Sequence, residues 1–343
     1  MSDRPLAERV SAPATLSPAT VDGIRWRPAT PTDVDALVEV GRAIALTDHP
    51  DWADTREDLL DELGHSYTDL AVDSLVAVTD AGSDSDAGEV VAWGLVVMPD
   101  LHETLVRVIL LGGVVPAHRG RGIGRALLAW QHGRALQRLA GCPSPLPGWI
   151  IVAADERAPA TGRTLERAGF APQRWFQNLA RTASEPVPAS APVDGIRVVS
   201  YRPEHSAAAH RVRDAAFRGV GSSQPMTDEQ WESMTTLTTY AHDLSFVALD
   251  AGGEVVGLLL TLVDPESSGD PDAYVWVVGV LPASRGRGAA RALLTAHLQA
   301  VRVAGVARSV LDVATDGPDE GVALFTGLGY RRRSASVNFV RRY

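Results

Sequence analysis

The sequence predicts an α+β protein made of two tandem lobes, each with its own mixed sheet. Three observations lead to this prediction: short motifs recur in the same order in both halves, hairpins and helices are mixed within each half, and a Pro/Ala/Ser-rich stretch separates the halves. The 343 residues suffice for two domains of ordinary size. Hydrophobic residues make up 45% and charged residues 22%, as is typical of a soluble globular protein.

Four landmarks define the repeat. They are V-D-G-I-R at 21–25 and 193–197, E-V-V at 89–91 and 254–256, an Arg/Gly loop at 119–124 and 285–290, and Gly-Phe or Gly-Tyr at 169–170 and 329–330. The stretch 182–192 has the composition of a linker. We therefore expect domains at 22–182 and 194–343, joined by a linker at 183–193. Residues 1–21 are rich in Ala, Pro and Ser and lack a signal-peptide pattern, so we expect a disordered tail.

The order of elements is the same in both lobes. Each lobe is expected to begin with a short strand (24–27; 196–201), helices (31–45; 205–217) and a hairpin (74–79 with 90–97; 245–250 with 254–263). A strand before the Arg/Gly loop (106–115; 274–281) and a helix after it follow. Each lobe should end with a buried strand (149–153; 310–314), a helix ending at the glycine of the fourth landmark, and a final strand. Hairpins within a helix-containing lobe predict a mixed sheet rather than a doubly wound parallel one.

Each Arg/Gly loop joins an apolar strand to the start of a helix. The helix stripes are Ile123, Ala126, Leu127 and Trp130, and Ala289, Ala292, Leu293 and Ala296, both at helical spacing. A helix N-terminus with glycine amides and nearby arginines is suited to binding phosphate, because glycine lets the amides approach the anion and arginine adds charge. Two copies predict two sites for a phosphorylated ligand.

The loops resemble the signature of the GCN5-related N-acetyltransferase (GNAT) superfamily, Gln/Arg-x-x-Gly-x-Gly/Ala at a strand–helix junction. A Val-x-Pro before the loop and the Gly-Phe or Gly-Tyr after the penultimate helix agree with it. The resemblance covers about 22–182 and 194–343, a tandem arrangement similar to that of the mycothiol synthases, whose second lobe is catalytic. It implies acetyl-CoA as the donor and transfer to the amine of a small molecule or peptide. The residues implied to bind this co-substrate are Val114, Val115, Arg119, Gly120, Arg121, Gly122, Ile123, Gly124 and Arg125, and Val280, Leu281, Arg285, Gly286, Arg287, Gly288, Ala289, Ala290 and Arg291.

Within the same resemblance, the strand ends 113–115 and 279–281 would pair with the pantetheine arm. Gly113 and Gly279 are candidates for a bulge that splays the strand from its neighbour. An amide there could also donate to the thioester carbonyl.

Other nucleotide sites fit less well. The chain has no lysine, so a P-loop NTPase is excluded. A dinucleotide fingerprint would need glycine where Arg125 and Arg291 stand. A plain strand–helix turn with solvated arginines remains the structural alternative.

Two accessory residues common in the superfamily are absent. Leu165 and Phe325 occupy the places of a tyrosine that protonates the leaving thiolate, and Arg157 and Gly317 those of an asparagine. Either another group serves as the acid, or one or both lobes have become acyl-CoA-binding or regulatory domains. We favour at least one active lobe, with a preference for the second.

The general base has several candidates. Asp312 and Asp316 lie on or after the buried strand of the second lobe, and Asp155 and Glu156 at the matching place in the first, while Glu103 precedes the strand before the first loop. Each can instead be a solvated acid at a strand end. The loops after the first helix are expected to help form the acceptor pocket; they include Asp48, His49, Asp51 and Trp52, and Ser222, Ser223, Met226, Asp228 and Trp231. For Thr227-Asp228-Glu229 a capped helix start is an equal alternative.

Composition limits the partners. A net charge of −10 argues against nucleic acid, no apolar run is long enough for a membrane helix, and no metal-ligand pattern is visible. Cys142 is the one cysteine, so an intramolecular disulfide is impossible and the cytoplasm is the expected compartment. Because Cys142 lies in a Gly/Pro-rich loop, we expect direct transfer in a ternary complex rather than a covalent acyl-enzyme.

Overall fold

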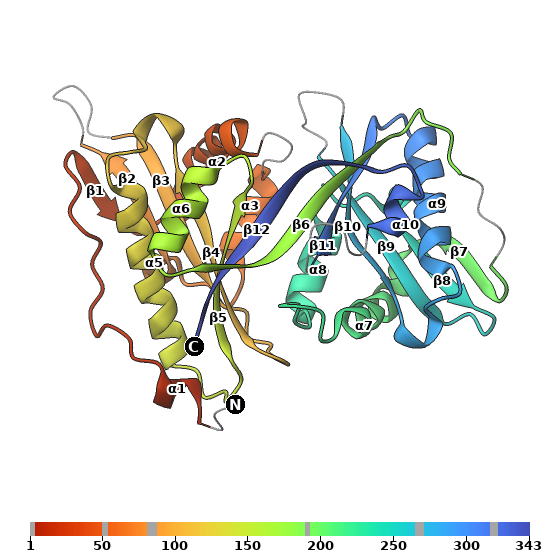
Figure 1. The fold of residues 1–343 in the computed structure, drawn as a ribbon, viewed down its shortest axis with the longest axis horizontal. Helices are drawn as coiled ribbons and strands as arrows, with labels where there is room; N and C mark the ends of the chain where they lie inside the picture. The colour runs from red at the N-terminus through yellow and green to blue at the C-terminus, as the bar shows by residue number, and fades with distance from the viewer. Residues whose placement is uncertain (1–3, 50–53, 81–87, 189–192, 265–270, 316–321) are drawn as a thin grey trace. The chain divides into compact units, whose positions relative to one another are not determined.

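The computed structural model describes residues 4–49, 54–80, 88–188, 193–264, 271–315 and 322–343. The chain forms two compact units (Figure 1). Unit 1 contains residues 1–173 and 337–343, and unit 2 contains residues 174–336. The chain leaves unit 1 within one long strand and re-enters it within the last strand, so each unit includes a strand segment from the other half of the sequence.

Unit 1 holds a helix α1 in the N-terminal segment and a sheet with helices on both faces. Its elements are α1 (Leu6–Arg9), β1 (Ile24–Arg27), α2 (Val34–Asp48), α3 (Arg56–Gly64), α4 (Leu70–Asp73), β2 (Ser74–Thr79), β3 (Val90–Val97), β4 (Val106–Val114), α5 (Ile123–Ala140), β5 (Gly148–Asp155) and α6 (Pro159–Arg167). The strand order is β1-β2-β3-β4-β5, antiparallel except for the parallel pair β4–β5. The end of β12 lies next to β5, where the backbones of Tyr343 and Gly148 exchange two hydrogen bonds.

Unit 2 repeats this arrangement. Its elements are β6 (Ala171–Thr182), β7 (Ile196–Ser200), α7 (Ser206–Phe217), α8 (Asp228–Thr236), β8 (Phe246–Asp250), β9 (Val255–Val263), β10 (Asp272–Val280), α9 (Ala289–Val303), β11 (Arg308–Thr315), α10 (Ala323–Thr326) and the start of β12 (Arg331–Arg342). The strand order is β6-β11-β10-β9-β8-β7, antiparallel except for the parallel pair β10–β11. The predicted α+β class with a mixed sheet in each lobe is confirmed.

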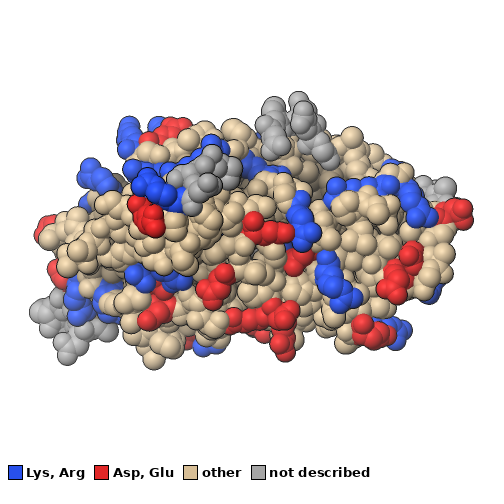
Figure 2. Space-filling view, turned by 90° about the horizontal axis from the view of Figure 1, so that it is seen from below, with Lys and Arg blue, Asp and Glu red and all other residues tan. Residues whose placement is uncertain are grey.

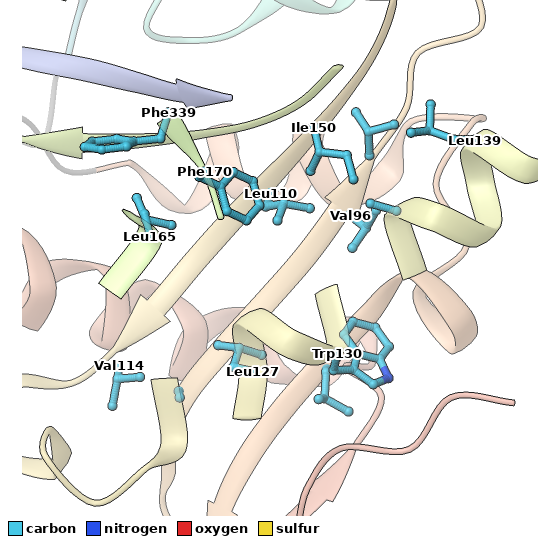
Figure 3. Packing of buried hydrophobic residues seen from close by; sticks show 14 of the residues in the cluster. Val96, Leu110, Val114, Leu127, Trp130, Leu139, Ile150, Leu165, Phe170 and Phe339 are labelled. Carbon is cyan, nitrogen blue, oxygen red and sulfur yellow. The ribbon is translucent and has the colours of Figure 1, made fainter. Parts of the chain in front are cut away.

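Apolar side chains fill both sides of each sheet. In unit 1 one cluster packs beneath α5 and a second beneath α2 and α3. Figure 3 shows part of the first cluster, where Leu165, Phe170 and Phe339 lie close together. Unit 2 has the same two layers, beneath α9 and beneath α7 and α8. The alternation of inward and outward residues along the strands accounts for both layers.

Strands β6 and β12 are each divided between the two units, so the units do not correspond to two uninterrupted halves of the sequence. Residues 175–182 of β6 pair with β11 and belong to unit 2, whereas residues 337–343 belong to unit 1. Alternating patterns place a strand on a sheet edge but do not identify its partner, so the sequence could not reveal this exchange. The domain ranges 22–182 and 194–343, with the linker 183–193, stay a prediction.

The N-terminal segment is ordered from Arg4 onward, contrary to the expected disordered tail. Leu6 is fully buried and Val10 nearly so, both in the cluster beneath α5. The Gln137 side chain donates to the Pro13 carbonyl over 2.9 Å. Composition alone suggested disorder, but two apolar anchors are enough to fix the segment on the helix.

Charge is mixed on the described surface. Arginine and acidic side chains are interspersed over the face in Figure 2. Within the described residues, no helix has both the length and the apolar character needed to cross a membrane.

Candidate functional site

A fork between two parallel strands opens in each unit. β4 and β5 pair only from Val106 with Gly148 to Ile109 with Ile151, although both strands continue. β10 and β11 pair only from Asp272 with Arg308 to Val275 with Leu311. Beyond those pairs the strands run on to the end where the Arg/Gly loop begins. Each fork therefore offers a strand edge that can receive an extended chain.

Each Arg/Gly loop ends on a glycine that starts a helix. Gly122 and Gly288 are the N-cap residues of α5 and α9, with φ of 91° and 88°. No side chain caps either helix. Gly120 and Gly286 also have positive φ. Glycine adopts this left-handed backbone conformation at little energetic cost. The loop then turns so that the amides of the first helical turn face outward. These amides are suited to holding a phosphate group.

The first arginine of each loop is engaged inside its unit. Arg119 donates through both Nη atoms to the Asp48 carboxylate, at 2.8 Å each, and through Nε to the Val114 carbonyl. Arg285 donates to the carbonyls of Val280 and Ala216. In both units this guanidinium therefore links the end of the strand before the loop to a helix, α2 in unit 1 and α7 in unit 2. That these side chains also bind the co-substrate stays a prediction.

Gly113 and Gly279 do not form the expected bulge. In β10 the pairing with β9 shifts between Val275 and Val277, which makes Trp276 the bulged residue. In β4 the left-handed position is Gly112, with φ of 105°. A Cβ on Gly113 would lie 3.1 Å from Ile44, and one on Gly279 would lie 3.1 Å from Ala216. Because Gly113 and Gly279 have no side chain, α2 and α7 can pack close to the ends of β4 and β10.

Three polar side chains meet at the fork of unit 2. The Tyr274 hydroxyl donates to Asp312 Oδ2 over 2.9 Å, and Asn178 Nδ2 donates to Asp312 Oδ1 over 3.2 Å. Asp312 follows Leu311, the last β11 residue paired with β10, and its side chain is exposed. Burial, and then the charge of Asp312, raise the pKa of Tyr274 well above its usual value. The carboxylate is therefore held in place by two donors at the closed end of the fork.

The matching positions of unit 1 are apolar. Tyr274 pairs with Leu262 and Val310, and the residue with the corresponding pairs in unit 1 is Ile109, which faces Val97 and Ile151. Two residues beyond Ile151 stands Ala153, in the place of Asp312. The two forks are alike in backbone but differ in chemistry, because the unit 2 fork alone has a carboxylate and a hydroxyl at these two places.

The other predicted bases lie elsewhere. Asp316 is outside the described residues. Glu103 is exposed and precedes the paired start of β4, at the opposite end of the pairing from the fork. Asp155 accepts hydrogen bonds from the backbone and guanidinium of Arg157, and Glu156 is exposed in the turn that follows. Of the predicted bases, Asp312 is the one at a fork.

Leu165 and Phe325, where the tyrosine was missing, are both buried among core side chains. Figure 3 shows Leu165 beside Phe170. Arg157 is exposed in a turn, and Gly317 is outside the described residues. Tyr274 and Asn178 were not among the site residues predicted from the sequence. A tyrosine in an otherwise apolar strand was the available signal for Tyr274.

The acceptor-loop candidates are only partly brought together. Asp48 is buried against Arg119, while Asp51 and Trp52 are outside the described residues. In unit 2 the alternative interpretation of 227–229 is confirmed: the Thr227 side chain caps α8 by accepting from the Gln230 backbone over 3.1 Å. Trp231 is buried and stacks on His210, with ring centroids 4.7 Å apart.

One carboxyl in unit 1 has a strongly shifted pKa. Burial raises the pKa of Glu62 on α3 to about 7, and the charges of Asp61 and Asp54 add to this, while Arg107 opposes it. Such a group can exchange protons at neutral pH. Glu62 lies on α3, which packs on α2. The fork of unit 2 is the stronger candidate site, because its three polar side chains are hydrogen-bonded to one another.

The residues present fit an acyl-CoA. Val280 is five positions after Val275, and at about 3.3 Å per residue the strand edge between them is about 16 Å long. A pantetheine arm laid along this edge from a pyrophosphate on the α9 amides would run toward Asp312. Pantetheine has the amides needed to bond a strand edge, and its thioester would meet a carboxylate and a hydroxyl.

Comparisons with known proteins agree with this fit. Residues 207–330, which lie within unit 2, match the model of the acetyltransferase (GNAT) family. A mycothiol acetyltransferase from Catenulispora acidiphila is 30% identical over 230 residues, covering 66% of this chain and 70% of the relative. One from Frankia alni is 26% identical over 345 residues, covering 98% and 96%.

Solved structures share the tandem fold. A GCN5-related N-acetyltransferase from Sphaerobacter thermophilus is similar with a TM-score of 0.72 and 25% identity, over 94% of this chain and 97% of that one. A tandem GNAT protein from the clavulanic acid biosynthesis pathway has a TM-score of 0.66 at 17% identity, over 93% and 98%, which is a likeness of fold.

Proposed function

Since this chain belongs to the GNAT family, as a tandem member that transfers an acetyl group from acetyl-CoA to an amine, we propose that the transfer takes place at the fork of unit 2. The observation that carries the proposal is the Tyr274–Asp312–Asn178 cluster at the closed end of the fork. Ile109 and Ala153 at the matching places of unit 1 offer no group that could accept a proton.

In this proposal the α9 amides and the loop 285–290 hold the pyrophosphate of acetyl-CoA, and the β10 edge holds its pantetheine arm. Bound there, acetyl-CoA supplies an activated acetyl group as a thioester. Asp312 attracts the ammonium of the acceptor, since opposite charges in contact gain Coulomb energy. Tyr274 and Asn178 fix the direction of that carboxylate.

The proton balance defines the role of Asp312. An alkyl ammonium has a pKa near 10, so the amine must lose a proton before it can attack the thioester. Two protons leave the ammonium as it becomes an amide: Asp312 accepts one and later passes it to water, and the other neutralises the thiolate of coenzyme A. A carboxylate positioned for such a transfer contributes roughly 10²–10⁴-fold to the rate.

We propose a small-molecule amine as the acceptor. The curated relatives are named for mycothiol, so the deacetylated form of mycothiol is the first acceptor to test. The Asp312 carboxylate, oriented by Tyr274 and Asn178, suits a cationic primary amine.

Thiol release from acetyl-CoA tests the function directly. The panel consists of deacetylated mycothiol, glucosamine, a polyamine and a peptide with a free N-terminus, each with wild-type protein and Asp312→Asn. We expect acceptor-dependent thiol release with wild-type protein and loss of at least 99% of it in the variant. Binding of acetyl-CoA without thiol release from any acceptor would favour the alternative, an acyl-CoA-binding protein. Undiminished turnover in Asp312→Asn would move the site away from this fork.

A further inference from the structure

A row of side chains continues from the fork of unit 2 along β11 and its other neighbour, β6. Beyond the fork β11 no longer pairs with β10, but it stays paired with β6 as far as Thr315. Alternate residues of the two strands point to opposite faces of the sheet. The residues buried beneath α9 are Leu179, Leu311 and Val313. The residues between them therefore face the side of α7, where Tyr274 also packs.

This β6–β11 row consists of Asp312, Asn178, Ala314, Phe176 and Arg174, all of them half-buried or exposed. Asp312 and Asn178 form one end of the row, in the hydrogen-bonded cluster at the fork. Ala314 and Phe176 face each other across the two strands in the middle. Arg174 forms the far end, four positions before Asn178, which corresponds to about 13 Å along β6. The row thus has a negative end, an apolar middle and a positive end.

The guanidinium of Arg174 lies against the loop that follows α7. A Cβ on Gly221 would overlap this guanidinium, so the two groups are in close contact. The Nε atom of Arg174 is buried and has no hydrogen-bond partner among the described residues, and none of the ion pairs of those residues includes it. By contrast, Arg213, Arg308 and Arg333 of the same unit each pair with an aspartate. Arg174 therefore has unused donors and an uncompensated charge, which a bound anion would satisfy.

The two charged ends of the row match a substrate with two charges of opposite sign. The proposed function assigns the ammonium of the acceptor to Asp312, and this inference rests on that assignment. The helix α9 packs on the opposite face of the sheet, so its amides and the row are on different faces. We propose that Arg174 is a specificity-determining residue that binds an acidic group of the acceptor. The preferred acceptor is then an amine that carries a carboxylate or phosphate about 13 Å from its nitrogen, with an apolar part that contacts Phe176.

Two matched acceptors test this inference. Tetraalanine, when extended, places its carboxylate about 13 Å from its amine, and tetraalanine with a C-terminal amide lacks the charge. Thiol release from saturating acetyl-CoA gives kcat/KM for each acceptor. We expect the wild-type protein to favour the acid at least about tenfold, the usual effect of a charge-assisted hydrogen bond. In Arg174→Gln this preference should disappear, while kcat/KM for the amide and the KM for acetyl-CoA stay within about twofold.

Three further variants separate charge, contact and strain. Arg174→Lys should keep part of the preference, because lysine has the charge but not the planar set of donors. Gly221→Ala leaves the arginine in place but displaces its guanidinium, so it should reduce the preference. Gly219→Ala is the matched control: Gly219 also has a positive φ, 72°, but a Cβ there meets no atom of the other described residues within 4 Å, so the preference should persist. Thermal unfolding of each variant checks that it folds.

Equal kcat/KM for the acid and the amide with wild-type protein would overturn the inference. An equal loss for both acceptors in Arg174→Gln would also overturn it, since this arginine would then serve the fold or the co-substrate. Calorimetry on protein saturated with coenzyme A separates this inference from the proposed function. If no amine is acetylated but tetraalanine binds more tightly than its amide in an Arg174-dependent way, the inference stands while the proposed function fails. Turnover that depends on Asp312 but shows no preference for the acid means the reverse.

Discussion

The Tyr274 hydroxyl donates a 2.9 Å hydrogen bond to Asp312, and Asp312 is the first β11 residue beyond the last pair with β10. This bond spans the two strands at the point where they separate. The hydrogen bond holds the Asp312 carboxylate beside the position that a pantetheine arm bound along β10 would reach.

Replacing Asp312 by Asn keeps the shape but removes the proton acceptor. We expect kcat to fall by about 100-fold or more, with little change in the KM for acetyl-CoA, because the phosphate and pantetheine contacts are elsewhere. Steady-state thiol release measures both constants. Glu103→Gln serves as the matched control in unit 1 and should leave kcat within twofold; a large loss there together with an active Asp312→Asn would put the base in unit 1.

Tyr274→Phe removes the donor that orients Asp312. We expect kcat to fall by about tenfold at each pH, as for a lost hydrogen bond to a charged group. Burial and the Asp312 charge raise the pKa of Tyr274 well above its usual value, so the hydroxyl keeps its proton up to pH 10. The pH profile of kcat should therefore show no alkaline decline from this group. A decline below pH 10 in wild-type protein that the variant abolishes would contradict this role.

Stability should fall in acid because of His297 in α9. Burial lowers the pKa of this fully buried imidazole to about 4. Between pH 6.5 and about 4 the unfolded chain binds a proton that the folded chain does not, so the free energy of unfolding decreases as the pH falls through this window, by up to about 3 kcal/mol. Below pH 4 the effect levels off.

The matched variant is His297→Gln, because Gln131 has the same place in α5, nine residues after the N-cap glycine. Urea unfolding at pH 4.5 and 7 should show a smaller difference between the two pH values in this variant than in wild-type protein. Some dependence should persist, since burial also lowers the pKa of His132 to about 4. An unchanged difference would rule out His297 as the source.

The N-terminal segment should contribute to the stability of unit 1. Leu6 is fully buried, and a Cβ on Gly148 would lie 2.9 Å from its Cδ2. Leu6→Ala should cost about 2–4 kcal/mol by leaving a cavity. Leu46→Ala, on a side chain that is 78% exposed, should cost less than about 0.5 kcal/mol. Equal effects of both substitutions in urea unfolding would mean that the segment does not anchor the core.

The sequence predicted what depends on local patterns. The strand before each loop, the glycine turn and the helix after it all follow from residues within about 30 positions, and the structure has them where they were expected. Thr227 as a helix cap was one of two interpretations, and local hydrogen bonding decided it.

Long-range partners could not be predicted in this way. Nothing in the local sequence around Arg119 indicates its ion pair with Asp48, 71 residues earlier. The bulge at Trp276 and the close helix at Gly279 depend on which strand and helix pack together. The composition around Leu6 predicted a disordered tail. The burial of Leu6 depends on its packing in the cluster with α5 and β5, which the local sequence does not show. A single sequence contains no record of these pairings.

The central claim is that acetyl transfer uses the fork of unit 2, and a pair of matched glycine variants tests it most directly. Gly288→Val and Gly122→Val place a β-branched residue at equivalent N-cap positions with φ near 90°, a conformation unfavourable for any residue but glycine. Thiol release with a saturating amine should fall below about 1% of wild type in Gly288→Val and stay above about half in Gly122→Val. Survival of turnover in Gly288→Val with its loss in Gly122→Val would contradict the account.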